Sequence, residues 1–361
     1  MIKKVLLLPW FLFLFHCAFT QNPLLQDSTL NNLVHPAGYK TCTIGDLGNV
    51  KKTGKGKHSM IVIPGLGFGG DKYDELIRHY KKIYTVYTIT PAGFDGTPAP
   101  PMPDAPVKYF SLPWTNGIEM GIINLIKKEN LYKPIILAHF VTGTQVALNL
   151  AHDHPDLISS AIIIGGSPYR YHPSQTTDGS WSDWENEQKY TPDQREKVLD
   201  YYWAPKWFKT VTKKTWDDNM WTPDDYCKDK TTGKDLFDSS ARVPIQVMVE
   251  YLLEWMAYDP HEKYKDIHVP VLVLVPDFKE LLSYTPKDTL SFKSYAAKQY
   301  LKYFHQVSWQ DAIDHGIDNF TFKTISDSRL FTWIDNPDVT YASIDDFIKS
   351  KSKMVKSNHL K

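Results

Sequence analysis

The sequence predicts an α/β fold, with a mostly parallel β-sheet flanked by helices and a helical insertion rich in tryptophan. Short apolar segments alternate with amphipathic ones over residues 58–166, and the alternation returns after residue 268. Fully apolar strands separated by helices are typical of a parallel sheet that is covered on both faces. Between these stretches, residues 169–265 have no strong strand pattern and hold seven of the 11 tryptophans.

The first part of the predicted sheet comes from four apolar segments, and helical patterns separate them. Apolar residues recur at helical spacing in each intervening segment, which indicates helices with one buried face. The predicted strands are 60–65, 84–91, 134–138 and 159–166, and the helices are 71–83, 117–128 and the segment that follows residue 138.

After the insertion, the sequence predicts strands at 268–276 and 319–325, a helical stretch near 288–306 and a last helix at 339–350. The insertion itself contains helical patterns at 195–208 and 243–256. We therefore expect a core formed by 22–168 and 266–361, and a helical cap at 169–265. The cap either stabilises the fold or forms one wall of a ligand pocket.

Residues 1–21 have the pattern of a secretory signal peptide. Lys3 and Lys4 precede a 15-residue apolar run, and a plausible cleavage site follows Thr20. The run is shorter than the about 20 residues that a membrane span needs. The sequence thus predicts a secreted or periplasmic protein with no stable membrane span after cleavage. An uncleaved anchor is the alternative.

Charge and cysteine content exclude several classes of function. The 41 basic and 41 acidic residues balance, and no basic block stands out, so a nucleic-acid partner is not expected. Beyond the signal segment the cysteines are Cys42 and Cys227. An oxidising compartment would permit a disulfide between them, but their spacing does not decide it. Neither a zinc pattern nor a cofactor motif is present, and no cofactor is predicted.

Four segments, in order, resemble those of α/β hydrolases with a cap domain. Residues 61–70 are similar to the oxyanion loop, with Pro64 in place of its histidine, and 90–101 resemble the loop after the next strand. Residues 138–156 resemble the nucleophile elbow and its helix, and 326–348 resemble the segment that carries the catalytic histidine. The resemblance implies an α/β-hydrolase fold.

This resemblance also implies that the catalytic triad is degenerate. It places Phe140 at the nucleophile position, Leu330 at the histidine position and Lys279 at the acid position, with Asp277 two residues earlier. A phenyl ring cannot attack a carbonyl carbon, and a leucine cannot accept a proton. The resemblance therefore implies a pseudoenzyme that has lost Ser-His-Asp hydrolysis.

Backbone donors of an oxyanion hole survive side-chain changes, and we expect them at Leu66 and Val141. They either hold a carbonyl or carboxylate of a ligand, or face water and pack under Phe140. The predicted ligand-binding residues are Leu66, Phe140, Val141, Leu330 and Ser167.

Several other polar residues are candidates for an active site at a different position. Packing, helix capping and turn formation are their more ordinary roles. His152 and His154 flank Asp153 at a spacing that does not put both on one helix face, so no metal site is predicted. The remaining candidates are Asp95, His139, Thr142, Thr144, Ser167, His172 and His315.

Three hypotheses on function remain. The first is a secreted, degenerate α/β hydrolase that binds an apolar ligand or a protein partner. The second is an active hydrolase of small esters that uses non-standard residues. The third is a structural or interaction protein whose pocket is filled by Phe140, Leu330 and aromatic residues of the cap. The matches to the elbow and to the histidine segment predict that Phe140, Leu330 and the end of the strand that carries Lys279 converge at one edge of the sheet, under the cap.

Overall fold

The computed structural model describes residues 40–102, 108–166, 222–279 and 319–358. It also describes Glu196, Leu199, Asp200, Ala204, Phe208, Trp309 and Ile313. The predicted signal peptide, Ser167, His172, His315 and the predicted helix near 288–306 lie outside these residues. Within the described part of the chain, no helix is both long and apolar enough to cross a membrane.

A seven-stranded sheet forms the centre of the molecule, in the order β1-β3-β2-β4-β5-β6-β7. All neighbouring strands are parallel except the pair β1–β3, which is antiparallel. The predicted parallel sheet is therefore confirmed, with an added edge strand at one end. The strands are β1 (Asn49–Thr53), β2 (His58–Ile63), β3 (Tyr84–Thr90), β4 (Ile135–His139), β5 (Ser160–Ile164), β6 (Val271–Pro276) and β7 (Phe320–Ile325).

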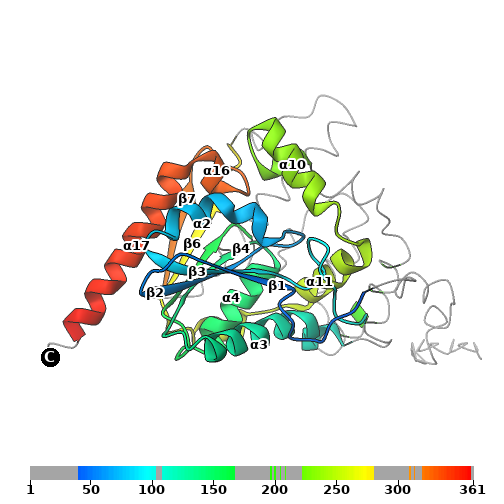
Figure 1. Cartoon of the computed structure of the whole chain (residues 1–361), viewed down its shortest axis with the longest axis horizontal. Helices are drawn as coiled ribbons and strands as arrows, with labels where there is room; N and C mark the ends of the chain where they lie inside the picture. Colours follow the sequence, from blue (N-terminus) through cyan, green and yellow to red (C-terminus); the bar gives the residue numbers. More distant parts are fainter. Residues whose placement is uncertain are drawn as a thin grey trace, which may run out of the picture.

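Helices cover both faces of the sheet (Figure 1). In this view α3 (Pro113–Lys128) and α4 (Thr142–Asp153) lie below it, and α2 (Asp74–Tyr80) lies above it. The last helix, α17 (Pro337–Asn358), packs against β6 and β7 and is red in Figure 1. Because both faces are covered, every residue of β4, β5 and β6 is buried, which explains why their sequences are almost entirely apolar.

The described residues between β5 and β6 contain helices and no strand. The helices are α9 (Pro223–Tyr226), α10 (Lys230–Ser240), α11 (Ile245–Ala257) and α12 (His261–Tyr264). The helix α11 is buried from Val247 to Ala257 and packs against α3, α4 and the short helix η3 (Tyr109–Ser111). A helix that is apolar on nearly all sides forms part of the core.

Candidate functional site

Four loops leave the sheet at the same edge. Since β2, β4, β6 and β7 are parallel, their carboxyl ends point the same way, and the segments after them meet there. These segments are 64–70, 140–141, 277–279 and 326–331. The last of them leads into the short helix α16 (Thr332–Asp335). Ligands bind at this edge in open α/β sheets.

The turn between β4 and α4 is strained at Val141. This residue has φ 53° and ψ −107° and stands immediately before the first turn of α4. A β-branched side chain at positive φ is a conformational outlier, and such strain gathers at functional turns. The turn is tight enough to need Gly143, where a Cβ would lie 3.0 Å from the Ile63 carbonyl oxygen. The strained position is thus Val141, one residue after Phe140.

The Phe140 ring packs inside the protein, against the loop that follows β2. A Cβ added to Gly65 would lie 2.6 Å from Phe140 Cε1, so only glycine fits beneath the ring. The Phe68 ring lies 6.0 Å from that of Phe140 between centroids, and Phe140 is 1% exposed. Phe140 therefore joins the end of β4 to the loop after β2 by packing.

His139 links three of the four loops through hydrogen bonds. Its Nε2 lies 3.0 Å from the carbonyl oxygen of Leu330, and its Nδ1 lies 2.6 Å from the Tyr73 hydroxyl. A carbonyl can only accept, so Nε2 carries the proton and Nδ1 accepts from Tyr73. The Tyr73 oxygen in turn accepts from the Gly65 N–H at 2.8 Å. We call this series of bonds the His139 network.

Burial keeps the His139 network neutral. His139 is fully buried, and this desolvation lowers the pKa of its imidazole to about 3, although the bond to Leu330 opposes the shift. Burial also raises the pKa of Tyr73 well above its usual range. The imidazole is uncharged at neutral pH and both ring nitrogens have partners, so no lone pair remains for a general base.

Aromatic rings surround the His139 network. The Phe331 ring lies 4.7 Å from the His139 ring and 5.0 Å from that of Phe68, between centroids. Trp333 lies 4.9 Å from His139. These rings line the region where the loops meet. The aromatic cluster consists of Phe68, Tyr73, His139, Phe140, Tyr226, Phe331 and Trp333, all buried.

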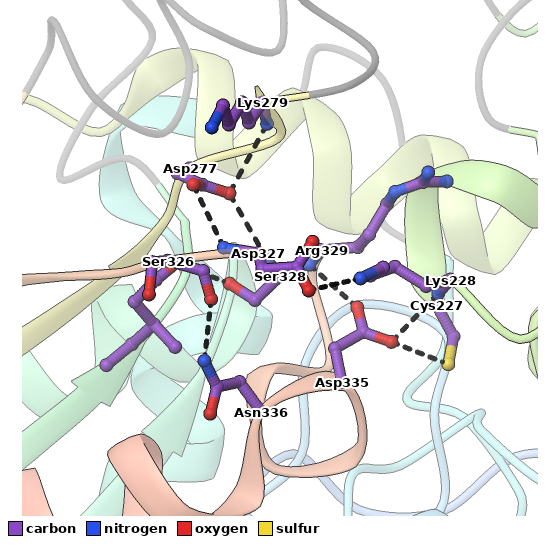
Figure 2. Close-up of polar contacts among 11 residues, drawn as sticks. Cys227, Lys228, Asp277, Lys279, Ser326, Asp327, Ser328, Arg329, Asp335 and Asn336 are labelled. Atoms are coloured by element: carbon purple, nitrogen blue, oxygen red, sulfur yellow. Dashed lines mark hydrogen bonds and ion pairs between the residues drawn. The ribbon is translucent and has the colours of Figure 1, made fainter.

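The side chain of Asp277 holds the loop after β7 by binding that loop's backbone N–H groups (Figure 2). Its carboxylate accepts N–H bonds from Asp327 at 3.0 Å and Ser328 at 3.2 Å. The backbone N–H of Lys279 also bonds to Asp277, at 3.3 Å, while the Lys279 side chain is exposed. The predicted acid position thus has no carboxylate, and the nearby one serves as a backbone acceptor.

A second carboxylate, Asp335, ties the same loop to the insertion (Figure 2). It accepts from the N–H groups of Arg329 and Lys228, each at 2.8 Å, and from the Cys227 thiol at 3.0 Å. Burial raises the pKa of Cys227 to about 12, so this thiol is not a nucleophile at neutral pH. Cys227 and Cys42 are both free, so the disulfide considered from the sequence is not formed.

Backbone pairing completes this attachment. The Leu330 N–H donates to the Asp225 carbonyl at 3.3 Å, and the Phe331 N–H donates to the Tyr226 carbonyl at 3.0 Å. Leu330 is fully buried and its own carbonyl accepts from His139. The loop is therefore bonded to α9 on one side and to β4 on the other.

By sequence, the chain matches no protein-family model and no curated protein. Solved structures do match it. The enol-lactonase from Burkholderia xenovorans has a TM-score of 0.53 and 13% identity, over 83% of this chain and 96% of that one. A hydrolase from Oleispira antarctica has a TM-score of 0.53 and 16% identity, over 85% of this chain and 98% of that one. MenH from S. aureus has a TM-score of 0.50 and 17% identity, over 84% of this chain and 98% of that one.

The chain has the α/β-hydrolase fold. These low identities establish the fold and leave activity open. In an α/β-hydrolase fold the nucleophile stands on the strained turn between a central strand and its helix. Here that turn is centred on Val141. The resemblance found in the sequence takes Ala138 as the first small residue of the elbow motif, and so predicts the nucleophile position at Phe140, one residue before Val141. Taking Gly143 as the last small residue of the motif would have predicted Val141 instead.

The expected oxyanion donors move with this register. The amide that follows the strained residue is that of Thr142, in place of the predicted Val141. Leu66 keeps its predicted place in the loop after β2 and is buried. None of the hydrogen bonds in the described part of the chain uses the N–H of Leu66 or Thr142.

The other candidates have structural roles where they are described. The helix α4 has no side-chain cap, so the capping predicted for Thr142 or Thr144 is wrong, and neither hydroxyl forms a hydrogen bond. Asp95 lies in a turn with φ 46°, as predicted. His139 packs at the strand end, again as predicted. Among described residues, no group of three acidic, histidine or cysteine side chains could hold a metal ion.

Proposed function

We propose that this chain uses the α/β-hydrolase fold for binding and does not hydrolyse esters or amides. The observation that carries the proposal is Val141 at the strained turn, because its isopropyl group offers no atom that could form a covalent intermediate. The same holds for the position predicted from the sequence, because neither Phe140 nor Val141 has a nucleophilic side chain.

The remaining catalytic roles support the same proposal. Leu330 stands where an imidazole would be needed, and Asp277 is occupied by backbone N–H groups. His139 is the one described histidine whose ring lies in the aromatic cluster, and it is neutral with both nitrogens bonded. A hydroxyl activated at this edge would find no base among the described residues.

The ligand class is suggested by what stays available at this edge. The N–H groups of Leu66 and Thr142 have no acceptor, and they are flanked by apolar and aromatic side chains. These features fit an apolar molecule that ends in a carbonyl or carboxylate. The leader-like sequence of residues 1–21 supports the proposal that this binding takes place outside the cytoplasm, in the secreted or periplasmic fraction.

Activity-based labelling tests the proposal. The purified protein is treated with a fluorophosphonate probe and, separately, with short-chain nitrophenyl esters. We expect no labelled residue and no turnover beyond the residual acceleration of about 10³–10⁴ over water that triad-less enzymes retain. A labelled Ser or Thr, identified by mass spectrometry, would show an active hydrolase with an unusual nucleophile.

Restoring the triad provides the matched comparison. We expect the triple variant Val141→Ser, Leu330→His, Lys279→Asp to gain probe labelling at residue 141. A second triple variant with Phe140→Ser in place of Val141→Ser should gain none, because that side chain packs on Gly65. Labelling at residue 140 alone would overturn the register of the turn.

A further inference from the structure

Two glutamates lie buried where α11 meets the core, away from the aromatic cluster. Glu250 and Glu254 stand one turn apart on α11, and each is 0% exposed. Glutamate is almost never fully buried unless it is paired. In the described part of the chain, no ion pair reaches either carboxyl group.

Glu254 has a structural partner in the first turn of α3. Its two oxygens accept from the N–H groups of Trp114 and Thr115, each at 2.7 Å, and from the Thr115 hydroxyl at 2.6 Å. The helix α3 has no cap of its own, because Leu112 stands at its N-cap position. Glu254 therefore supplies from α11 the acceptors that the amino end of α3 lacks.

Glu250 lacks such a partner among the described residues. Neither of its oxygens forms a hydrogen bond there, although the Tyr109 hydroxyl lies close enough to act on its carboxyl group. Burial raises the pKa of Glu250, the neighbouring charge of Glu254 raises it further, and the Tyr109 hydroxyl opposes the shift only in part. A carboxylate without a partner is expensive to hold in the protein interior, whereas a neutral carboxylic acid is tolerated there.

Within the described part of the chain, the surrounding elements supply no cation to offset this charge. From η3, Tyr109 faces the pair, and its N–H donates to Asp200, another buried carboxyl. Lys108 acts on Asp200 and is itself exposed. The remaining charged groups on the packed elements are otherwise engaged or exposed: Glu119 with His154, Asp153 with His152 and Lys263, Glu196 beside Asp200, and Asp95 at the surface.

We propose that the Glu250–Glu254 pair makes the docking of α11 on α3 proton-dependent, so that α11 stays docked while Glu250 is protonated and separates as that proton leaves. The same movement would release the loop after β3, since the Tyr251 hydroxyl donates to the Ala92 carbonyl at 2.9 Å. The Tyr251 ring also packs on that of Trp114, 5.1 Å away between centroids. The pair thus controls a contact between the segment that follows β5 and the sheet core.

The direction follows from the raised pKa values. A carboxyl group whose pKa is raised in the docked state binds its proton more tightly in that state. Docking of α11 is therefore strongest below the ordinary glutamate pKa of 4.5 and weakens as the pH rises above it. Glu254, whose pKa burial raises to about 7, contributes to this loss up to that pH. Glu250 extends the loss to higher pH because its pKa is raised further.

Hydrogen exchange across a pH series tests the proposal. Exchange of the amides in 245–257, corrected for the intrinsic effect of pH, should speed up by about tenfold per pH unit where one proton controls opening. Peptides from β4 and β5 serve as an internal reference and should keep their protection. In the variant Glu250→Gln, amide exchange in 245–257 should stop depending on pH above about pH 7. At pH 9 these amides should be at least about tenfold better protected from exchange in the variant than in the wild type.

Two further variants make the outcome decisive. Glu119→Gln removes another carboxyl whose pKa is raised by burial, on α3, and should leave the exchange of α11 as dependent on pH as in the wild type. If Glu250→Gln fails to fold, Glu250→Met supplies an apolar side chain of similar volume and should give the same profile, with a dependence that ends near pH 7. Identical pH profiles in wild type and Glu250 variants, or equal loss of protection in β4, would overturn the proposal.

Discussion

The His139 network and the Glu250–Glu254 pair are both buried, yet they respond to pH in opposite directions. Burial lowers the pKa of His139 from 6.5 to about 3 and raises that of Glu254 from 4.5 to about 7. The cause is the same in both, since loss of water penalises the charged form whatever its sign. Every bonding group of the His139 network has a partner, whereas neither oxygen of Glu250 forms a hydrogen bond among the described residues.

The consequence for stability can be worked out for each region. A histidine with a lowered pKa stabilises the fold fully above pH 6.5, and this contribution is lost as the pH falls toward 3. The glutamates act in the reverse sense, and their contribution is lost as the pH rises above 4.5. Between these values the two contributions to stability have opposite slopes, so they partly cancel there.

The largest expected effect is that of His139→Ala. It opens a cavity, and in the interior it leaves the Tyr73 O–H without an acceptor and the Leu330 carbonyl without its donor. We expect a loss of about 3–5 kcal/mol in the free energy of unfolding. Urea denaturation at pH 7 measures it. His152→Ala, at a partly exposed position on α4, is the control and should lose far less; a similar loss in both would remove the special role assigned to the network.

A second prediction concerns how His139 affects the free energy of unfolding at acidic pH. The variant His139→Phe keeps a ring in the cluster but cannot titrate. Its deficit in unfolding free energy relative to the wild type should shrink by about 1.4 kcal/mol per pH unit below pH 6.5, because the wild type then loses its advantage. Denaturation curves at pH 7.0, 6.0 and 5.0 give this difference directly. A deficit that stays constant over the series would mean that the imidazole is not held neutral.

The third prediction concerns packing at the turn. Gly65→Ala should destabilise the protein by about 1–3 kcal/mol, because its Cβ would meet the Phe140 ring. In the double variant Gly65→Ala, Phe140→Leu the smaller side chain gives way, and the combined loss should be less than the sum of the two single losses. Additive losses in the thermal or urea denaturation of all three variants would contradict the contact.

Much of the fold was predictable because its signals are local. The apolar strands and the helix over 243–256 follow from period and length, and the structure has that helix at Ile245–Ala257. The edge strand β1 was missed: its residues are mostly exposed, and its position comes from pairing with β3, which no local pattern encodes. The register of the turn failed because Ala138 and Gly143 are both small, and only backbone angles distinguish the two alignments.

The candidate site was less predictable for a related reason. The convergence of the loops follows from the order of the strands, and Leu330 is buried in one of these loops. The His139 network joins residues 73, 139 and 330, and nothing in their spacing points to hydrogen bonds between them. The roles of Asp277 and Asp335 were equally hidden, because both act on backbone N–H groups that every sequence contains.

The smallest expected effect concerns Lys279, at the position where a catalytic acid would stand. Its side chain is exposed, and among the described residues its hydrogen bond comes from its backbone N–H, which any residue but proline keeps. Lys279→Asp should therefore change the unfolding free energy by less than about 0.5 kcal/mol. Asp277→Asn is the matched change two residues away and should cost more, because the Asp327 and Ser328 N–H groups lose a charged acceptor. Urea denaturation of both variants ranks them, and a larger loss for Lys279→Asp would show that position 279 carries an interaction of its own at this edge of the sheet.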